Sequence, residues 1–339
     1  MTDSGLKLYG RALPENEKAL IRRIRSRARS RRRQRVLRTG IGDDAAVLGC
    51  PSGFEILVTT DFSLEGVHFR REWHPADSVG HRCLTRGLSD IAAMGGDPLA
   101  TFLSLALPAD LPQDWVDGFV RGLLRLGREY DVPLAGGDTA ESPGGVLADI
   151  VVVGRVPTGK ALLRSGARPG DSIYVTGELG RSSWTLQRLR EGGLAALAPK
   201  GKPRYADHDP HFYPQPRIAV GQWLRKQGLA TAAIDVSDGL STDLGHVCEE
   251  SGVGALVFEA AVPRPSGLPT SSLHYALHGG EDYELLFAAP RSRPVPAKVA
   301  GVRITRIGEI IRGRDLWLVD SHGQRKTLPQ RGWEHFSSR

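Results

Sequence analysis

The sequence predicts a two-domain protein of the α/β (α+β) class, and three observations predict it. The chain has 339 residues, 40% of them hydrophobic and 24% charged, which is enough for two domains that each bury a core. Short apolar segments typical of strands alternate with longer segments of helical periodicity in both halves. A stretch rich in Gly, Pro and Arg at residues 158–171 interrupts them. We therefore expect domains at residues 1–157 and 158–339.

The pattern in the first half of the chain predicts three helices and four strands. Residues 14–38 favour a helix because a short apolar stripe precedes a run of arginines. Residues 75–94 favour a second helix, since apolar residues recur at helical spacing before two glycines end the pattern. A third helix is expected from Asp110, a residue type that caps helices, to about Tyr130. The expected strands are residues 55–60, 100–107, 132–135 and 148–154.

The second half mixes the same kinds of element. We expect helices at residues 181–190 and 216–227, and another from about residue 240. We expect strands at residues 172–176, 232–235, 254–259, 283–288, 302–310 and 316–319. Residues 193–212 and 260–273 are expected to be loops.

The positive charge of the chain is local. The formal net charge is +7, but ten arginines lie within residues 22–38, and without them 35 basic residues face 38 acidic ones. Such a run is more often a solvated helix face than a binding patch. No aromatic side chains are interleaved with it to stack on bases. We favour the solvated face, and a nucleic-acid-binding module is the alternative.

The cysteines and the apolar runs indicate the cellular compartment in which the protein is expected. Cys50, Cys83 and Cys248 are an odd number with no CxxC pair, which indicates neither a disulfide framework nor a zinc site. The strongest apolar runs are far too short to span a bilayer, and the first residues do not resemble a secretory signal. We expect a soluble protein of the reducing cytoplasm, without a membrane partner.

Acidic residues stand on the expected turns between apolar elements. One loop aspartate is usually a turn former or a helix cap, but several at strand ends beside Gly, Ser or Thr are typical of a cation site. If these turns meet, their charges repel one another unless cations neutralise them. The set comprises Asp43, Asp44, Asp61, Asp90, Asp138, Asp235, Asp238, Glu281 and Asp282.

All of these candidate ligands are oxygen donors, and neither the cysteines nor the histidines cluster with them. Hard oxygen ligands suit Mg²⁺, which typically bridges carboxylates to substrate phosphates. Adjacent glycine amides can approach phosphate oxygens closely. The pattern therefore predicts nucleotide-dependent phosphoryl transfer, in which catalysis is mostly positioning and charge neutralisation.

The common nucleotide-binding motifs are absent. Gly159-Lys160 and Gly201-Lys202 are not followed by Ser or Thr, so neither is a P-loop, and the protein-kinase signatures are missing. Residues 40–45 match a loose dinucleotide-binding fingerprint. We reject it because two carboxylates would face a pyrophosphate without a cation, and because no strand is expected before it.

Eight motifs between Gly40 and Phe336 stand in one order. They are GIGDDAAVL, VTTDFSLEGVHF, LSDIAAMGGDP, GGDT, LLRSGARPGD, IDVSDGLSTDLGH, GGEDYELLF and RGWEHF. In this order they resemble the thiamine-monophosphate kinase family, and GGEDYELLF is the most diagnostic. The resemblance implies a two-domain aminoimidazole ribonucleotide synthetase-like fold. Its N-terminal ATP- and Mg-binding domain would form a barrel with its twin in a homodimer, and its C-terminal domain would be α/β.

The resemblance also implies roles for matching positions, with ATP and thiamine monophosphate as substrates and several Mg²⁺ ions as cofactors. The metal ligands would be Asp44, Thr59, Thr60, Asp61, Asp90, Asp138, Asp235 and Asp238, of which Asp44, Asp61, Asp138 and Asp238 are taken as catalytic. ATP would contact Tyr130, Gly137, Asp138, Arg164 and Ser237. Thiamine monophosphate would contact His68, Glu281 and Trp333, the last through its flat aromatic face.

Three of these residues have ordinary structural alternatives. Trp333 can be a C-terminal side chain packed on the core. His68 can be a surface histidine whose hydrogen bonds are satisfied, and Arg164 a charge that flanks a strand. Cys83 lies on an apolar helix face and is given no chemistry.

The implied reaction needs no strong base. The acceptor is a phosphate that is already anionic at neutral pH, so we expect direct in-line transfer with Mg²⁺ neutralising the phosphates. Sister enzymes are the rivals. A selenophosphate synthetase would need a reactive cysteine in a glycine-rich N-terminal loop, and a hydrogenase maturation protein a C-terminal cysteine, whereas this chain ends HFSSR. Aminoimidazole ribonucleotide synthetase lacks the GGEDYELLF pattern.

Overall fold

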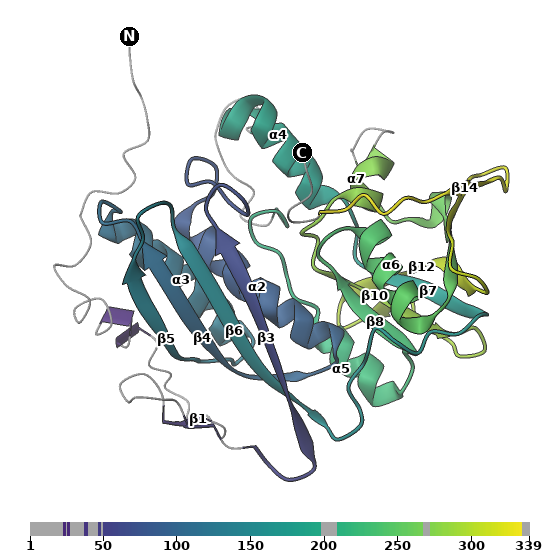
Figure 1. The fold of residues 1–339 in the computed structure, drawn as a ribbon, viewed down its shortest axis with the longest axis horizontal. Helices are drawn as coiled ribbons and strands as arrows, with labels where there is room; N and C mark the ends of the chain where they lie inside the picture. The colour runs from purple at the N-terminus through teal and green to yellow at the C-terminus, as the bar shows by residue number, and fades with distance from the viewer. Residues whose placement is uncertain are drawn as a thin grey trace. The chain divides into compact units, whose positions relative to one another are not determined.

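The computed structural model describes residues 23–24, 26–27, 37–39, 47–48, 50–197, 209–266 and 272–333 of the chain. The chain consists of two compact units (Figure 1). The first comprises Met1–Gly87 and Pro98–Arg155, and the second comprises Leu88–Asp97 and Val156–Arg339. Both units combine strands with helices, so the predicted mixed class is confirmed.

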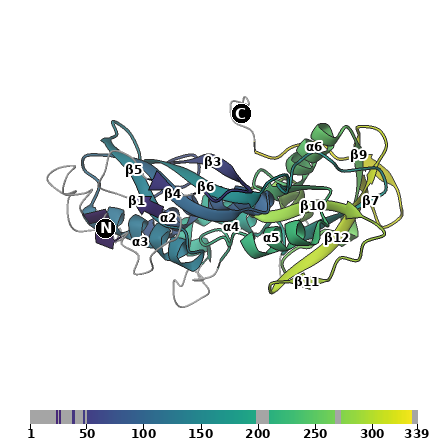
Figure 2. The ribbon, with the colours of Figure 1, turned by 90° about the horizontal axis from the view of Figure 1, so that it is seen from below.

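The first unit is built on a four-stranded sheet. Its elements are β3 (Phe54–Leu64), β4 (Asp97–Leu107), β5 (Leu134–Glu141), β6 (Leu147–Pro157), α2 (Ala76–Ala93) and α3 (Gln113–Glu129). The end of α2, from Leu88 on, belongs to the second unit. The strand order is β3-β6-β4-β5, and β4 and β5 are parallel. Helices α2 and α3 cover the same face of this sheet in both views (Figures 1 and 2).

Glycines allow the helix layer of the first unit to pack closely. A Cβ at Gly80 would lie 1.9 Å from the carbonyl oxygen of Phe119, so α2 and α3 touch through their backbones. A Cβ at Gly87 would lie 2.4 Å from a methyl carbon of Val152 on β6. Helix α2 therefore sits directly on the sheet.

The other face of the four-stranded sheet is open. Successive side chains of a strand point to opposite faces, and on β3 Leu57 is buried while Ile56, Val58 and Phe62 are 46%, 64% and 53% exposed. Three large apolar side chains thus form an exposed row on one strand. A row of this kind is typical of a surface that another chain covers.

The second unit is built on an eight-stranded sheet. Its strands are β7 (Asp171–Thr176), β8 (Ala232–Val236), β9 (Gly254–Phe258), β10 (Glu284–Pro290), β11 (Lys298–Val299), β12 (Val302–Ile311), β13 (Leu316–Val319) and β14 (Arg325–Thr327). The order is β14-β13-β9-β12-β7-β10-β8, with β11 paired to β12. The β13–β9 pair is parallel, whereas β10 is antiparallel to both β7 and β8.

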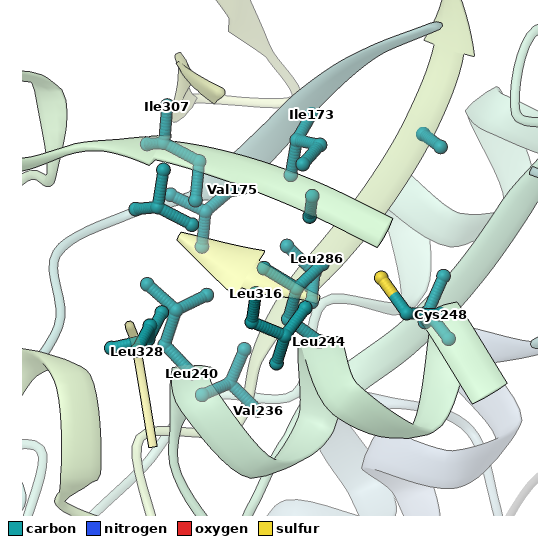
Figure 3. Packing of buried hydrophobic residues seen from close by; sticks show 14 of the residues in the cluster. Ile173, Val175, Val236, Leu240, Leu244, Cys248, Leu286, Ile307, Leu316 and Leu328 are labelled. Carbon is teal, nitrogen blue, oxygen red and sulfur yellow. The ribbon is translucent and has the colours of Figure 1, made fainter. Parts of the chain in front are cut away.

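The core of the second unit lies between this sheet and helices that include α6 and α7. The helical elements are α4 (Arg181–Gly192), η1 (Gly193–Leu197), α5 (Ile218–Gln227), α6 (Leu240–Ser251), η2 (Glu259–Ala261) and α7 (Leu273–His278). Figure 3 shows Leu240, Leu244 and Cys248 of α6 packed with Val175 and Leu286 of the sheet. Because this contact is apolar and buried, it fixes α6, and with it the loop that joins β8 to α6.

Several predicted boundaries were wrong. The helix expected at residues 14–38 does not reach its predicted end, because Leu37–Thr39 forms strand β1, which pairs with β2 (Val47–Leu48). Asp110 does not cap α3: the N-cap is Pro112, whose backbone is extended. The segments expected to be loops contain η1, η2 and the start of α7, and the short strands β1, β2, β11 and β14 were not predicted.

Two arginines of the basic run are engaged in the first unit. Both Arg23 and Arg27 form ion pairs with Asp117 on α3, and Gln113 also donates a hydrogen bond to this carboxylate at 2.8 Å. Burial alone would raise the pKa of Asp117, but the hydrogen bonds from Arg23, Gln113 and Arg27 bring it below its ordinary value. These two arginines of the run therefore bind α3, which goes beyond the solvated face that was predicted.

The described helices include none that combines the length and the apolar composition needed to cross a membrane. All three cysteines are free thiols. Cys83 and Cys248 are both buried, as predicted for Cys83, and Cys248 belongs to the apolar core of the second unit.

Candidate functional site

Four of the predicted site residues meet at the turn between β8 and α6. Ser237 and Asp238 follow the last residue of β8, and Gly239 precedes α6. Gly239 has a φ of 118°, a conformation that side-chain-bearing residues rarely adopt. The VSDG sequence therefore folds as a sharp turn at the end of a buried strand, and we call residues 237–239 the 237–239 loop.

Two other segments bind this loop through their backbones. The Glu281 N–H donates a hydrogen bond to the Ser237 carbonyl at 2.7 Å, and the Trp333 N–H donates one to the Asp238 carbonyl at 3.0 Å. Glycine makes both approaches possible. A Cβ at Gly280 would lie 2.5 Å from the Ser237 oxygen, and a Cβ at Gly332 would lie 2.3 Å from the Asp238 oxygen. The structure thus brings Ser237, Asp238, Glu281 and Trp333 together.

A buried carboxylate holds the 237–239 loop from the helix side. Asp243 lies in the first turn of α6 and is 2% exposed. One of its oxygens accepts the N–H groups of Asp238 at 3.2 Å and Gly239 at 3.0 Å. Burial, and then the nearby charge of Asp238, raise the pKa of Asp243 to about 7. The turn-based search of the sequence missed this residue, because it lies inside a helix.

The segment that carries Glu281 is held in an unusual backbone conformation. Glu281 and Tyr283 have φ values of 66° and 53°, which are uncommon for residues with side chains. The Tyr283 N–H donates to the Val236 carbonyl at 2.8 Å. Because strain of this kind persists only where surrounding contacts enforce it, the turn is set by its neighbours.

Asp282 anchors the same segment to helix α4. Its carboxylate accepts the N–H groups of Gly180 at 2.7 Å and Ser182 at 3.4 Å, at the N-terminus of α4. A carboxylate at a helix N-terminus satisfies amides that have no partner in the helix. Burial raises the pKa of Asp282 to about 8, although these N–H bonds act to lower it. Asp282, grouped with the cation-binding candidates by sequence, is a helix cap in the structure.

Asp235 lies on the other face of β8. Ile234 and Val236 belong to the core under α6, so the side chain between them points away from it. Asp235 is 3% exposed, and its Oδ2 accepts the Ser89 hydroxyl at 2.7 Å. Since Ser89 immediately precedes Asp90 on α2, the Asp235 and Asp90 positions are neighbours within the second unit.

Strand β3 of the first unit presents its predicted metal ligands on two faces. Thr59 and Asp61 are half-buried on the side of α2, whereas Thr60 is exposed on the open face. Thr60 can therefore share an ion with Asp61 only through its main-chain carbonyl.

The first unit also contains a carboxylate that the sequence search missed. Asp149 lies within β6, and its Oδ1 is buried without a hydrogen-bond partner among the residues that the structure describes. Burial raises the pKa of Cys83 to about 12, and the charges of Asp61 and Asp149 add to this. The available signal was a lone aspartate in the otherwise apolar segment LADIVVV. A buried carboxylate oxygen without a partner suits a cation or a donor group of a ligand.

The GGDT segment forms part of β5. Asp138 is exposed and lies opposite Ser104 of β4, and its Oδ1 accepts the Thr139 N–H at 2.8 Å. A Cβ at Gly137 would lie 1.9 Å from the Leu103 carbonyl oxygen, so strand pairing alone requires glycine there. The predicted ATP contact of Gly137 is an additional role that stays a prediction.

The remaining predicted residues are distant from one another in sequence and lie on different structural elements. His68 Nδ1 accepts the Leu64 N–H at 3.0 Å, so the neutral ring carries its proton on Nε2. Tyr130 is the C-cap of α3. The Arg164 carbonyl accepts the Ser251 hydroxyl at the C-terminal end of α6. Since α6 has 12 residues, this is about 18 Å along the helix from the 237–239 loop.

The predicted magnesium site stays a prediction. In the part of the chain that the structure describes, no group of three or more His, Cys, Asp or Glu side chains could hold a metal ion. Asp43 and Asp44 lie outside the described residues. The carboxylates of Asp235, Asp238 and Asp149 are oxygen donors, and in their chemistry they fit Mg²⁺.

Two family models match the chain. The N-terminal domain of AIR synthase related proteins matches residues 42–156, and the C-terminal domain matches residues 168–320. The chain is 39% identical over 333 residues to the thiamine-monophosphate kinase of Escherichia coli strain K12, covering 95% of this chain and 98% of that relative.

Solved structures agree with this likeness. The thiamine-monophosphate kinase from Stenotrophomonas maltophilia K279a has a TM-score of 0.79 at 36% identity and covers 91% of this chain and 98% of its own. AaThiL complexed with AMPPCP and TMP has a TM-score of 0.70 at 30% identity and covers 94% of this chain and 97% of its own.

The buried cap at Asp282 predicts a specific pH dependence of stability. Between its ordinary value of 3.8 and about 8, the folded protein holds a proton that the unfolded chain has lost. The contribution of this carboxyl to the free energy of unfolding therefore falls as pH rises through that window. An Asp282→Asn variant is neutral throughout, so its stability relative to the wild type should rise from pH 4 to pH 8 in urea unfolding. A difference that stays constant over this range would contradict the assignment.

Proposed function

This chain belongs to the thiamine-monophosphate kinase family, and we propose that it transfers the γ-phosphoryl group of ATP to thiamine monophosphate. The products are thiamine diphosphate and ADP. The curated relative that is 39% identical carries this activity in its name, and a related structure holds AMPPCP, an ATP analogue, together with TMP. Thiamine monophosphate and ATP are therefore the substrates that we assign.

One observation of the structure carries the proposal. The 237–239 loop, which carries Asp238, is hydrogen-bonded through its backbone to Glu281 and Trp333. A carboxylate of this kind suits a metal ion on a phosphate chain, and an aromatic ring suits a flat cationic heterocycle such as the thiazolium. The geometry supports binding of both substrates at this loop.

The proposed roles follow the family's motif positions. Mg²⁺, when bound, would neutralise the charge on the phosphates and so reduce their mutual repulsion. We assign its binding to Asp44, Thr59, Thr60, Asp61, Asp90, Asp138, Asp235 and Asp238. Tyr130, Gly137, Asp138, Arg164 and Ser237 are assigned to ATP, and His68, Glu281 and Trp333 to thiamine monophosphate.

The main task of the chain's own residues in this reaction is to orient the two substrates. The acceptor phosphate is an anion at neutral pH, so no side chain has to remove a proton from it before direct in-line attack. What the protein supplies is a fixed position for both substrates. The backbone hydrogen bonds that tie Glu281 and Trp333 to the 237–239 loop are suited to that task.

We also propose a homodimer that works in the cytoplasm. The N-terminal domain, expected at residues 1–157, would use the open face of its sheet to form a barrel with a second copy. The exposed row Ile56, Val58 and Phe62 supports this, because large apolar side chains in a row favour a covered surface. Three free cysteines are consistent with a reducing compartment.

The catalytic assignment of Asp238 is tested by steady-state kinetics. The purified chain should form thiamine diphosphate from ATP, Mg²⁺ and thiamine monophosphate. Asp238→Asn should lower kcat/KM by about 100-fold or more at limiting Mg²⁺, since it weakens charge stabilisation in the transition state. Asp315→Asn, which changes an exposed aspartate of the same unit, is the control and should act like the wild type. Wild-type turnover in Asp238→Asn would remove Asp238 from the metal site, and a folded wild type without product would refute the function.

The dimer is tested by light scattering on a variant of the open face. Val58→Glu places a charge in the middle of the exposed apolar row, and its desolvation should disfavour association. We expect twice the chain mass for the wild type and the single chain mass for this variant. Leu163→Glu changes another exposed apolar residue, 50% exposed in the second unit, and should leave the dimer intact. A dimeric Val58→Glu, or a monomeric wild type, would contradict the proposed surface.

A further inference from the structure

Two consecutive peptide groups of the 237–239 loop are held from both sides. The peptide that joins Ser237 to Asp238 donates its N–H to Asp243 at 3.2 Å, and its carbonyl accepts the Glu281 N–H at 2.7 Å. The next peptide, from Asp238 to Gly239, donates its N–H to the same Asp243 oxygen at 3.0 Å, and its carbonyl accepts the Trp333 N–H at 3.0 Å.

The planarity of the peptide bond links the two sides. The N–H and the C=O of one peptide group lie in one plane and point in opposite directions. An acceptor that fixes the N–H direction therefore also fixes the direction of the carbonyl on the other side. Here a single side chain, Asp243, orients both planes, and the two carbonyls receive the segments that carry Glu281 and Trp333.

Helix capping alone does not account for this arrangement. The N-cap residue of α6 is Gly239, which has no side chain, and an acidic side chain in the first turn commonly reaches back to accept the N–H of the N-cap residue. Asp243 does this for Gly239, but it also accepts the N–H of Asp238, which lies before the helix begins. The second bond acts on the loop.

We propose that Asp243 is a positioning residue for Glu281 and Trp333. It orients the two peptide planes of the 237–239 loop whose carbonyls accept the N–H groups of these two residues. This inference rests on the proposed function for its kinetic consequence, whereas its structural part is independent of any substrate. Asp243 touches neither substrate in this account and acts only through the backbone.

The segment that carries Trp333 also contacts Thr242, a residue that the segment carrying Glu281 is not shown to use. The Thr242 hydroxyl oxygen accepts the Gly332 N–H at 3.0 Å. The segment that carries Glu281 contacts the same helix turn at another residue, since the Ser241 hydroxyl lies 2.8 Å from His278 Nδ1. It is also held by Asp282, which accepts the Gly180 N–H at the N-terminus of α4. A change at Asp243 should therefore weaken the backbone hydrogen bonds of both Glu281 and Trp333. A change at Thr242 should weaken that of Trp333 alone.

The test combines hydrogen exchange with kinetics on three variants. Asp243→Ala removes the acceptor, Asp243→Asn keeps an acceptor oxygen in the same place without the charge, and Asp320→Ala removes a carboxylate that accepts the backbone N–H groups of His322 at 2.8 Å and Gln324 at 3.0 Å in a distant turn. Amide exchange is followed by NMR without ligands. Turnover is followed with ATP, Mg²⁺ and thiamine monophosphate.

We expect Asp243→Ala to accelerate exchange of the Glu281 and Trp333 amides, although their own acceptors are unchanged. It should also raise KM for thiamine monophosphate and lower kcat/KM by about 10- to 100-fold, as outer positioning residues do. Asp243→Asn should restore both toward the wild type, and Asp320→Ala should change neither. Thr242→Val should accelerate exchange at Trp333 and spare Glu281.

Other outcomes overturn the proposal. If Asp243→Ala accelerates exchange only at Asp238, Gly239 and the first turn of α6, with KM unchanged, Asp243 is a helix cap and no more. If Asp243→Asn is as damaging as Asp243→Ala, the charge matters and the acceptor geometry does not. If Asp243→Ala does not fold, hydrogen exchange of the wild type tests the proposal instead. The proposal requires that the amides of Asp238, Gly239, Glu281 and Trp333 exchange with one common opening rate, and different opening rates would overturn it. An inactive wild type would refute the proposed function, while the exchange result would still stand.

Discussion

The site depends on the orientation of two peptide groups at the end of strand β8. Their N–H groups point to the carboxylate of Asp243, and their carbonyls accept the Glu281 and Trp333 amides. Segments that are about 40 to 100 residues apart in sequence thus meet on one short stretch of backbone. Backbone hydrogen bonds fix such a meeting more rigidly than side-chain contacts do, because peptide planes have few alternative orientations.

The fold was predictable where one local pattern dominates. The helix expected at residues 75–94 is α2 (Ala76–Ala93), because its apolar residues keep one period and Gly95 ends it at a φ of 67°. The prediction failed at α3, since Pro112 fixes the entry into the helix and leaves Asp110 outside it. Strand β3 extends beyond its predicted end because pairing within the sheet, which no local pattern encodes, sets strand length.

The residue types of the candidate site were predictable from the sequence, but the hydrogen-bond partners of these residues were less so. The pattern of acidic residues on turns singled out Asp238 and Glu281, because both stand on turns beside strands, and the family resemblance added Ser237. It missed Asp243, since an aspartate inside a helix looks like a surface residue until its long-range burial is known. It grouped Asp282 with the cation ligands, whereas Gly180, about 100 residues earlier, makes it a helix cap. Partners that are distant in sequence decide which carboxylates face a ligand and which support the backbone.

The most direct measurement of the central claim is a crystal structure of this chain with AMPPCP, Mg²⁺ and thiamine monophosphate. We predict a Mg²⁺ ion about 2.1 Å from an Asp238 oxygen, with thiamine monophosphate in contact with Glu281 and Trp333. The carbonyls of Ser237 and Asp238 should still accept the amides of those two residues. A ligand-bound structure in which Asp238 binds no ion and the substrate contacts neither Glu281 nor Trp333 would contradict the account.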